Sequence, residues 1–271
     1  MAYGKEQTGM TEMEENRKDL PAAEAVSAHD RVPDIKEELI SKAKELGVKI
    51  NAEQTEKFQI YLEMLLEWNE KINLTAITDP HEAVIKHFVD SAAFLKYVNV
   101  KQGAKLIDVG TGAGFPGVVI KIMRPDIKLT LLDSLNKRLI FLKELCSKLQ
   151  LDAEFVHKRA EEAGKIVGMR ECYDIATARA VAGMNTLCEY CIPLIKMKGL
   201  FVAMKGPGFD EEMKTAEKAV NILGCKVNKV EKFSLPDSEG SERNIAVLQK
   251  VRFTPKDYPR HGNKITKSPI V

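Results

Sequence analysis

Between residues 34 and 98, apolar positions recur at intervals of three and four residues, the spacing that places them on one face of an α-helix. The first such segment is Ile35–Leu46. The second opens at Asn51, and Gln54 stands three residues later, as in a capping box. A third begins at Asp79-Pro80, an N-cap residue followed by proline at the first helical position. The pattern predicts an all-helical module over residues 34–98.

From residue 99 the periodicity changes. Short apolar runs of strand length alternate with amphipathic helical segments, which is typical of a parallel sheet with helices on both faces. The last two strand-like runs have only the loop 234–243 between them, so one of these strands should be antiparallel. We therefore expect a doubly wound α/β fold over residues 99–252, with a mostly parallel sheet and one antiparallel strand. The expected strands are Lys105–Val109, Lys128–Asp133, Ala153–His157, Tyr173–Ala178, Leu200–Lys205, Lys226–Phe233 and Asn244–Val251, and the expected helices are Val118–Met123, Lys137–Leu149, Met184–Lys196 and Glu211–Leu223.

The two ends of the chain lack either periodicity. Residues 1–31 hold seven acidic and four basic residues and few large apolar ones. We expect residues 1–33 to be an acidic, disordered or loosely attached extension. Residues 251–271 hold five basic residues and one acidic residue, and prolines recur among them. Residues 253–271 are accordingly predicted to be a basic tail, either in contact with phosphates or simply solvated.

Composition narrows the class of protein. With 271 residues and 44% hydrophobic content the chain can bury a sizeable core, and a net charge of +2 gives no overall field that would attract nucleic acid. No secretory or membrane-spanning segment is apparent, so we expect a cytoplasmic protein. We also expect a monomer. Cys188 and Cys191 have the spacing of redox and zinc sites, but they lie in an apolar helical pattern and lack a second pair. They are interpreted as core residues, and no metal is expected.

A glycine-rich loop is the strongest functional signal. The strand expected at Lys105–Val109 runs directly into four closely spaced glycines, and an apolar helical segment follows. Glycine lets the backbone turn sharply and approach a ligand without a Cβ atom in the way. The next strand ends in an acid, twenty-three residues after the first glycine, where a carboxylate can bind ribose hydroxyls. The pattern predicts an adenosine-containing cofactor bound by Gly110, Gly112, Gly114 and Asp133.

Asp108 favours one cofactor over another. The segment Gly112–Gly117 satisfies the dinucleotide pattern G-x-G-x-x-G and taken alone would admit NAD or FAD. Asp108 stands two residues before the first glycine, where a buried carboxylate is costly unless a polar group meets it. S-adenosylmethionine carries an ammonium and a sulfonium, whereas a diphosphate would be repelled there. The order of acid and glycines thus favours S-adenosylmethionine; the alternative for Asp108 is a carboxylate that accepts N–H bonds from the loop.

Seven blocks of sequence follow one another in a distinctive order. They are Trp68–Thr75, His87–Ser91, Asp108–Gly117, Asp133–Leu142, Arg159–Glu162, Ala178–Ala180 and Met204–Gly206. In this order they resemble the bacterial RsmG family, also called GidB, and the resemblance covers residues 34–271. It implies a class I S-adenosylmethionine-dependent methyltransferase fold preceded by a small helical module, and methylation of N7 of one guanine in 16S ribosomal RNA, naked or within the small ribosomal subunit.

The resemblance also assigns roles to individual residues. The family's cofactor contacts fall on Gly110, Phe115, Ala160, Glu161 and Arg179, in addition to the acids and glycines above. Arg179, Lys205 and His87 are the expected catalytic residues, with the first two at strand ends on the cofactor side. Basic side chains can hold the phosphates or the base, so Arg138, Lys205, Arg243, Arg260 and Lys264 are expected to contact RNA, and the resemblance adds Asn69 and Asn73 from the helical module. In the tail, residues 263–266 depart from the family's usual Gly-Thr-Pro element.

The implied reaction asks mainly for alignment. Guanine N7 has an in-plane lone pair and carries no proton, so its attack on a sulfonium methyl group needs orientation rather than a general base. Two other classes stay open on sequence grounds. One is a methyltransferase of a small molecule or protein, and the other is an RNA-binding factor that keeps the fold without the activity. An NAD-dependent oxidoreductase is the least favoured alternative.

Overall fold

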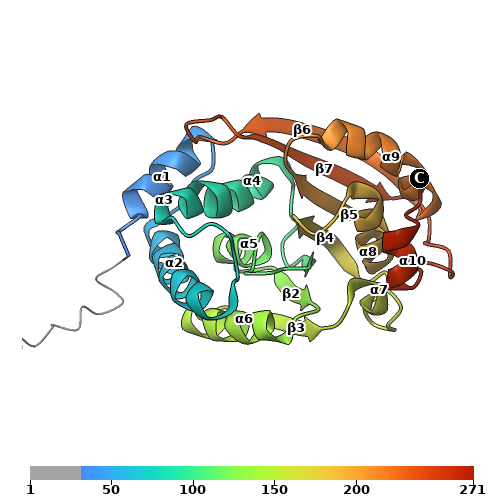
Figure 1. The fold of residues 1–271 in the computed structure, drawn as a ribbon, viewed down its shortest axis with the longest axis horizontal. Coiled ribbons are helices and arrows are strands. Elements are labelled where there is room, and N and C mark those ends of the chain that lie inside the picture. The colour runs from blue at the N-terminus through green and yellow to red at the C-terminus, as the bar shows by residue number, and fades with distance from the viewer. Residues whose placement is uncertain (1–31) are drawn as a thin grey trace, which may run out of the picture. The chain divides into compact units, whose positions relative to one another are not determined.

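The computed structural model describes residues 32–271, which form one compact unit. The extension expected at residues 1–33 therefore lies outside the described residues, except for its last two positions. A seven-stranded sheet runs through the unit in the order β3-β2-β1-β4-β5-β7-β6 (Figure 1). Its strands are β1 Lys105–Val109, β2 Lys128–Asp133, β3 Ala153–His157, β4 Tyr173–Arg179, β5 Ile195–Lys205, β6 Cys225–Ser234 and β7 Glu242–Lys250.

The strand directions confirm the expected fold class. Strands β1 to β5 pair in parallel, while β7 is antiparallel to both of its neighbours, β5 and β6. The chain moves outward from β1 to β3 and then returns to place β4 on the other side of β1. Strand order thus reverses between β1 and β4, and in open α/β sheets ligands bind at the carboxyl ends of the strands beside such a reversal.

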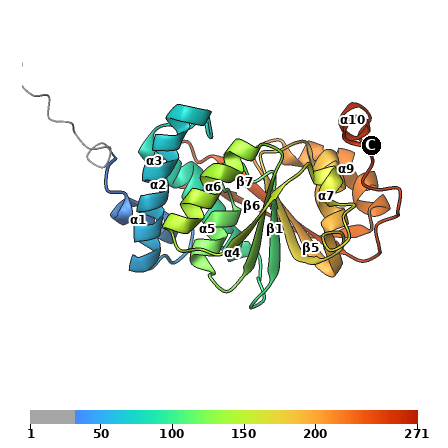
Figure 2. The ribbon, with the colours of Figure 1, turned by 90° about the horizontal axis from the view of Figure 1, so that it is seen from below.

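Helices cover both faces of the sheet (Figure 2). The N-terminal helices α1, α2 and α4 pack with α5 and α6 on one face, and α7, α8 and α9 lie on the other. The helical bounds are α1 Lys36–Glu45, α2 Ala52–Ile72, α3 Pro80–Ala83, η2 Val84–Val89, α4 Asp90–Tyr97, α5 Gly117–Met123, α6 Asn136–Lys148, α7 Ala160–Ala163, α8 Met184–Cys191, η3 Ile192–Leu194, α9 Phe209–Ile222 and α10 Gly262–Lys267.

The N-terminal helices share their hydrophobic core with the sheet. Phe58 and Tyr61 of α2 and Phe88 of η2 are fully buried in the same cluster as Val118 of α5 and Phe141 of α6. Burial of aromatic side chains of this size contributes roughly 1.5–3 kcal/mol each. Residues 34–98 are therefore one layer of the same compact unit as the sheet. This packing fixes the N-terminal helices against the face of the sheet that α5 and α6 cover.

The predicted helix starts are present. Asn51 caps α2 by accepting from the Gln54 N–H at 2.9 Å, and the Gln54 side chain accepts from the Asn51 N–H at 3.0 Å. Asp79 caps α3 by accepting from the Glu82 N–H at 2.8 Å. Each bond satisfies a backbone donor that the first helical turn leaves free.

The helix expected at Met184–Lys196 is shorter in the structure. Helix α8 ends at Cys191, and the 3₁₀ turn η3 leads directly into β5, which begins at Ile195 rather than at Leu200. Pro193 lies in that turn, and a proline has no N–H with which to continue a helix. Cys188 and Cys191 are fully buried, and burial raises the pKa of both thiols, as expected of core residues.

The C-terminal tail is folded against the protein. Helix α10 contacts α8, and Ile265 is fully buried while Ile270 is nearly so. The solvated tail considered above is therefore wrong, because the segment supplies apolar anchors to the core. Within residues 32–271 no helix has the length and apolarity needed to cross a membrane, and no cluster of side chains suited to a metal ion is present there.

Candidate functional site

Two cavities open at the carboxyl ends of the parallel strands, and Ala180, the first residue after β4, lines both. The first, here the glycine-loop cleft, has a volume of about 570 Å³. The second, here the arginine cavity, has a volume of about 360 Å³. The glycine-loop cleft is lined by Val109, Gly110, Leu132, Asp133, Ser134, Arg138, Lys158, Arg159, Ala160, Glu161, Ala180, Val181, Ala182, Thr186, Tyr190 and Thr266. The arginine cavity is lined by Ile77, Lys86, His87, Asp90, Arg179, Ala180, Met204, Lys205, Gly206, Phe233, Arg243, Asn244 and Ile245.

The buried carboxylate of Asp108 accepts hydrogen bonds from both ends of the glycine loop. Its Oδ2 accepts from the Thr111 hydroxyl at 2.7 Å and from the Gly117 N–H at 2.9 Å. The side chain is fully buried and lines neither cavity, and burial raises the pKa of its carboxyl to about 6. The alternative interpretation, a carboxylate that accepts bonds from the loop, is thus confirmed for Oδ2. Oδ1 has no hydrogen-bond partner among the described residues.

Asp133 and Gly110 shape the floor of the glycine-loop cleft. Asp133 accepts from the Gly112 N–H at 2.9 Å and from the Leu135 N–H at 2.8 Å, so its carboxylate is fixed at the end of β2. Gly110 has a φ of 69°, and a Cβ atom there would lie 2.8 Å from a methyl carbon of Val181. Glycine is therefore required at this position both for its backbone conformation and for space.

The C-terminal helix completes one wall of this cleft. Thr266 of α10 lines the cleft together with Glu161 of α7, a carboxylate that is 7% exposed. Gly262 packs so closely on Glu161 that a Cβ atom would overlap its carboxylate. Sequence reasoning placed Ala160 and Glu161 here but missed Thr266 and Tyr190. Nothing local marks these two residues, because only the docking of the tail and of α8 brings them to the cleft.

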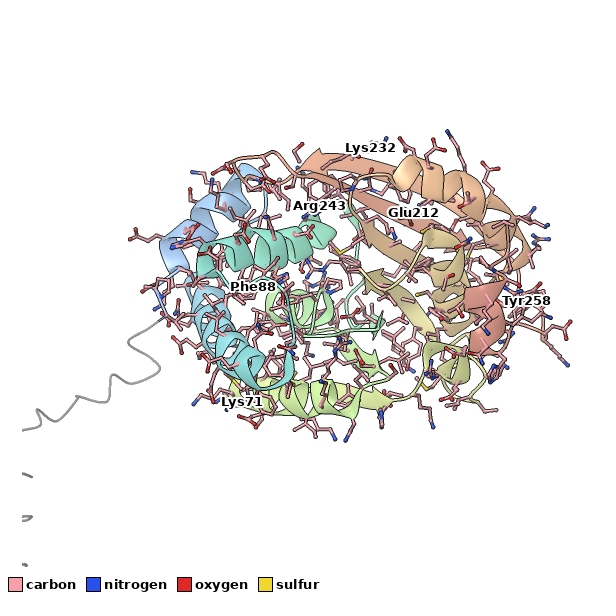
Figure 3. All side chains as sticks on the ribbon, in the orientation of Figure 1. Lys71, Phe88, Glu212, Lys232, Arg243 and Tyr258 are labelled. Atoms are coloured by element: carbon pink, nitrogen blue, oxygen red, sulfur yellow. The ribbon has the colours of Figure 1, made fainter. Side chains whose placement is uncertain are left out.

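Arg179 is the centre of the arginine cavity. It ends β4, and its Nη1 donates to Asp90 Oδ2 at 3.0 Å and to the Lys86 carbonyl at 2.9 Å. Arg243, labelled in Figure 3, reaches from β7 to the same Asp90 oxygen at 3.3 Å. The structure thus brings together four predicted residues from distant parts of the chain, which are His87, Arg179, Lys205 and Arg243.

His87 is neutral and has hydrogen-bond partners at both ring nitrogens. Its Nδ1 lies 3.2 Å from Arg179 Nη2, which can only donate, so Nε2 carries the proton and donates to the Thr75 hydroxyl at 2.8 Å. Burial, together with the Arg179 charge, lowers the His87 pKa to about 3. The imidazole stacks on Phe115 with ring centroids 4.5 Å apart. It is therefore built to orient Arg179 and is poorly suited to proton transfer.

A short π-helix places these groups. The element η2 carries both His87 and the Lys86 carbonyl that Arg179 contacts, and π-helical turns occur often at functional sites. The sequence predicted only an ordinary helix here. Phe115, expected to form an apolar wall for the cofactor, instead stacks on His87 and lies under the Arg179 guanidinium, 5.0 Å from its ring centroid. It lines neither cavity, so its cofactor contact stays a prediction.

Lys205 is tied to its surroundings. Its Nζ donates to the Ala182 carbonyl at 2.9 Å and pairs with Glu212 of α9 at 2.7 Å. These contacts hold the loop that follows β4 and separates the two cavities. Asn244, which sequence reasoning missed, also lines the arginine cavity and is 1% exposed.

The other residues predicted to contact RNA are spread over the surface around the cavities. Arg138 lines the glycine-loop cleft and lies 3.4 Å from Asp133, and Lys264 is exposed on α10. Asn69 accepts from the Thr75 N–H at 2.8 Å, and Asn73 ends α2 with a φ of 50°. Arg260 pairs with buried Glu189 at 2.7 Å. Asn69 and Arg260 thus have partners within the chain, and their RNA contacts stay predictions.

Comparison with known proteins gives a consistent result. A family model described as rRNA small subunit methyltransferase G (GidB) matches residues 54–245. The chain is 46% identical over 235 residues to the ribosomal RNA small subunit methyltransferase G of Bacillus velezensis, covering 86% of this chain and 98% of that protein. It is 47% identical to the protein of the same name from Bacillus subtilis with the same coverage. The counterpart in Alkaliphilus metalliredigens is 47% identical over 83% of this chain and 95% of its own length.

Proposed function

The chain belongs to the rRNA small subunit methyltransferase G family, and from this premise we propose that it transfers the methyl group of S-adenosylmethionine to N7 of one guanine in 16S ribosomal RNA. The expectation of a methyltransferase of the class I fold is confirmed by that membership together with the mostly parallel sheet and its single antiparallel strand. We further propose that the protein acts as a monomer in the cytoplasm.

One observation carries the proposal: the two cavities adjoin at Ala180. A donor in the glycine-loop cleft and an acceptor base in the arginine cavity would therefore have neighbouring reactive atoms, and such alignment is the main requirement of the reaction. The glycine-loop cleft fits an adenosine-containing donor. Gly110 allows close approach of the backbone, and the nearly buried carboxylates of Asp133 and Glu161 offer acceptors to hydroxyl and ammonium groups. Asp108 supports the loop from beneath.

The chain's residues orient the acceptor base. Of the five donors of the Arg179 guanidinium, three are used by Asp90, the Lys86 carbonyl and His87. The remaining donors can bind the O6 acceptor that adjoins N7 on guanine. S-adenosylmethionine, when bound, supplies an electrophilic methyl group. Because N7 carries no proton, His87 acts as a positioning residue, and Lys205 holds the loop between the cavities.

The experiment compares two RNA preparations. Purified protein and radiolabelled S-adenosylmethionine are incubated with 16S RNA from cells that lack this protein and with 16S RNA from wild-type cells, both as naked RNA and as small subunits. We expect incorporation only into RNA from the deficient cells, at one guanine mapped by borohydride and aniline cleavage. Equal incorporation into both preparations would overturn the assignment and favour another methyl acceptor, such as a small molecule or a protein.

A binding control tests the cofactor independently. S-adenosylhomocysteine at about 100 times its Kd should stabilise the folded protein by about 2.7 kcal/mol, because it binds the native state alone. NAD at the same concentration should leave the Tm unchanged. The reverse result would point to the oxidoreductase alternative.

A further inference from the structure

Two buried oxygens at the arginine cavity lack hydrogen-bond partners among the described residues. They are Oδ1 of Asp90 and Oδ1 of Asn244. Both residues line the cavity, and they are 4% and 1% exposed. A buried acceptor without a hydrogen-bond partner destabilises the fold, because the loss of its bonds to water is not compensated. Both oxygens belong to residues that line one cavity, and both are covered by neighbouring atoms, so a ligand that brings two donors has to displace those neighbours to reach them.

The orientation of Asn244 follows from its neighbours. Its Nδ2 donates to the Gly206 carbonyl at 3.0 Å and to a Glu242 carboxylate oxygen at 3.2 Å. Both partners are acceptors, so the amide cannot be turned over without placing oxygen against oxygen. The free end of Asn244 is thus an acceptor. For Asp90, the other carboxylate oxygen is held by Arg179 and Arg243, which leaves Oδ1 as its available end.

The rest of the cavity suits a flat base. Met204, Phe233 and Ile245 supply apolar surface, while the cationic groups come from Arg179 and Arg243. Guanine presents adjacent donors on its Watson–Crick edge, N1–H and the 2-amino group. Adenine presents an acceptor at N1 and only a C–H at position 2. A pair of acceptors therefore favours guanine and disfavours adenine, because adenine would leave both oxygens unpaired.

We propose that Asp90 and Asn244 form an acceptor pair that reads the Watson–Crick edge of the guanine, with Asp90 Oδ1 accepting from N1–H and Asn244 Oδ1 from the 2-amino group. The inference rests on the proposed function and deepens it. N1–H is the more acidic donor and takes the charged acceptor, since charge-assisted hydrogen bonds are the stronger ones. The guanine must also be unpaired in the complex, because a paired base has no free Watson–Crick edge.

This assignment gives Asp90 a part in the chemistry. Methyl transfer to N7 forms the N7–C bond, breaks the bond from carbon to sulfur and leaves a positive charge on the guanine ring. A carboxylate bonded to N1–H stabilises that developing charge. The same carboxylate offsets the nearby cations of Arg179 and Arg243, which would otherwise oppose it.

The test uses inosine, which keeps N1–H, O6 and N7 but lacks the 2-amino group. The mapped target guanosine is replaced by inosine in an otherwise identical RNA, and kcat/KM is measured on both. We expect the wild-type protein to prefer guanosine by about 10-fold or more, because inosine leaves Asn244 unpaired. Asn244→Ala should lower kcat/KM on guanosine RNA and bring the guanosine-to-inosine ratio down by about 5-fold or more.

Thr177→Val is the matched control. Thr177 also has a fully buried oxygen without a partner among the described residues, but it does not line the arginine cavity. Its variant should keep the wild-type ratio. If Asn244→Ala lowers activity on both RNAs equally, Asn244 has a structural role only and the inference is overturned. If Asn244→Ala does not fold, Asn244→Ser serves in the same comparison.

The wild-type protein alone can also refute the inference. Equal kcat/KM on guanosine and inosine RNA would mean that no group reads the 2-amino group. Failure of the proposed function looks different. In that case the wild-type protein, with S-adenosylhomocysteine binding demonstrated, methylates neither RNA.

Discussion

Two arginines of the protein pair with buried carboxylates, and the two pairs differ in one respect. In the Glu189–Arg260 pair, which anchors the tail, both carboxylate oxygens are bonded to Arg260, at distances of 2.7 to 3.1 Å. In the Asp90–Arg179 pair of the arginine cavity, Oδ2 is bonded and Oδ1 has no partner among the described residues. The carboxylates are equally hidden, with side chains 1% and 6% exposed.

We call Glu189–Arg260 the structural pair and Asp90–Arg179 the functional pair, because only the second has a carboxylate oxygen left for a substrate. A buried ion pair stabilises only when its remaining hydrogen-bonding positions are filled, as they are for Glu189. Asp90 carries the cost of an unfilled position, and it lies where a substrate can fill it. The two pairs therefore differ in whether both carboxylate oxygens have hydrogen-bond partners, and not in burial or charge.

The largest effect should come from breaking the structural pair. Glu189→Ala leaves the partly buried Arg260 without a counterion, so the free energy of unfolding should fall by about 3 kcal/mol, the lower end of the range for broken buried pairs. Urea titration measures this. At a temperature where the variant is folded and S-adenosylmethionine is saturating, kcat should stay within about 3-fold of wild type, because the pair touches neither reacting group.

The control for this prediction is the double variant Glu189→Leu with Arg260→Met. Replacing both charges with apolar side chains should recover most of the lost stability, since neither charge is then left unpaired. A Glu189→Ala protein within about 1 kcal/mol of wild type would contradict the structural role.

Asp90→Asn should lower activity strongly and stability only slightly, the reverse of Glu189→Ala. Asparagine keeps an oxygen for Arg179, so we expect a loss of unfolding free energy of only about 1–2 kcal/mol. The variant loses the negative charge that stabilises the methylated ring, so kcat should fall about 100-fold. Single-turnover rates with saturating RNA measure the chemical step. Unchanged kcat beside a stability loss as large as that of Glu189→Ala would place Asp90 with the structural residues.

The sequence predicted the cofactor side of the site better than it predicted the two arginine–carboxylate pairs. The positions of most strands, the glycine loop and the carboxylate of Asp133 follow from local periodicity and spacing, and the structure confirms where they lie. The family resemblance indicated Arg179, whereas Arg243 was expected to contact RNA only because it is basic. Neither pattern could identify the partner of Arg260, because Glu189 lies 71 positions earlier and meets it only after the tail docks.

The sequence also could not predict which buried oxygens would lack hydrogen-bond partners. Asn244 looked like an ordinary strand residue, and its free oxygen depends on Gly206 and Glu242 occupying its amide nitrogen. The π-helical turn that aims His87 at Arg179 also has no sequence signature. These features depend on the final packing of distant segments, whereas helix caps and strand periods depend on neighbours in the chain.

His87 gives a prediction of intermediate size, through pH. Its folded pKa is about 3, below the ordinary 6.5, so between these values the unfolded chain binds a proton that the folded protein excludes. Stability should therefore be retained above pH 6.5 and lost as the pH falls, by at most about 1.4 kcal/mol per pH unit. Relative to His87→Gln, the wild-type protein should lose about 2 kcal/mol between pH 6.5 and 4.5.

Urea titrations of both proteins across this range measure the difference. Asp108 has a folded pKa raised to about 6, so its own contribution falls as the pH rises from 3.8. That opposite trend is present in both proteins and cancels in the comparison. A pH-independent difference would mean that His87 takes up a proton as readily in the folded protein as in the unfolded chain, and the proposed contact of its Nδ1 with Arg179 would then be wrong.

The smallest effect should come from Lys264, an exposed cation on the helix that the structural pair anchors. If the Glu189–Arg260 pair serves to present α10 to RNA, Lys264→Gln should weaken RNA binding about 3-fold and reduce the slope of log K against log salt by about 0.7–0.9. Lys128→Gln, an exposed lysine at the opposite end of the sheet where β2 begins, is the control and should change neither. Filter binding at several salt concentrations gives both quantities. Equal slopes for the two variants would limit the tail to its structural part in the wall of the glycine-loop cleft, because a phosphate contact must release counterions and a structural contact does not.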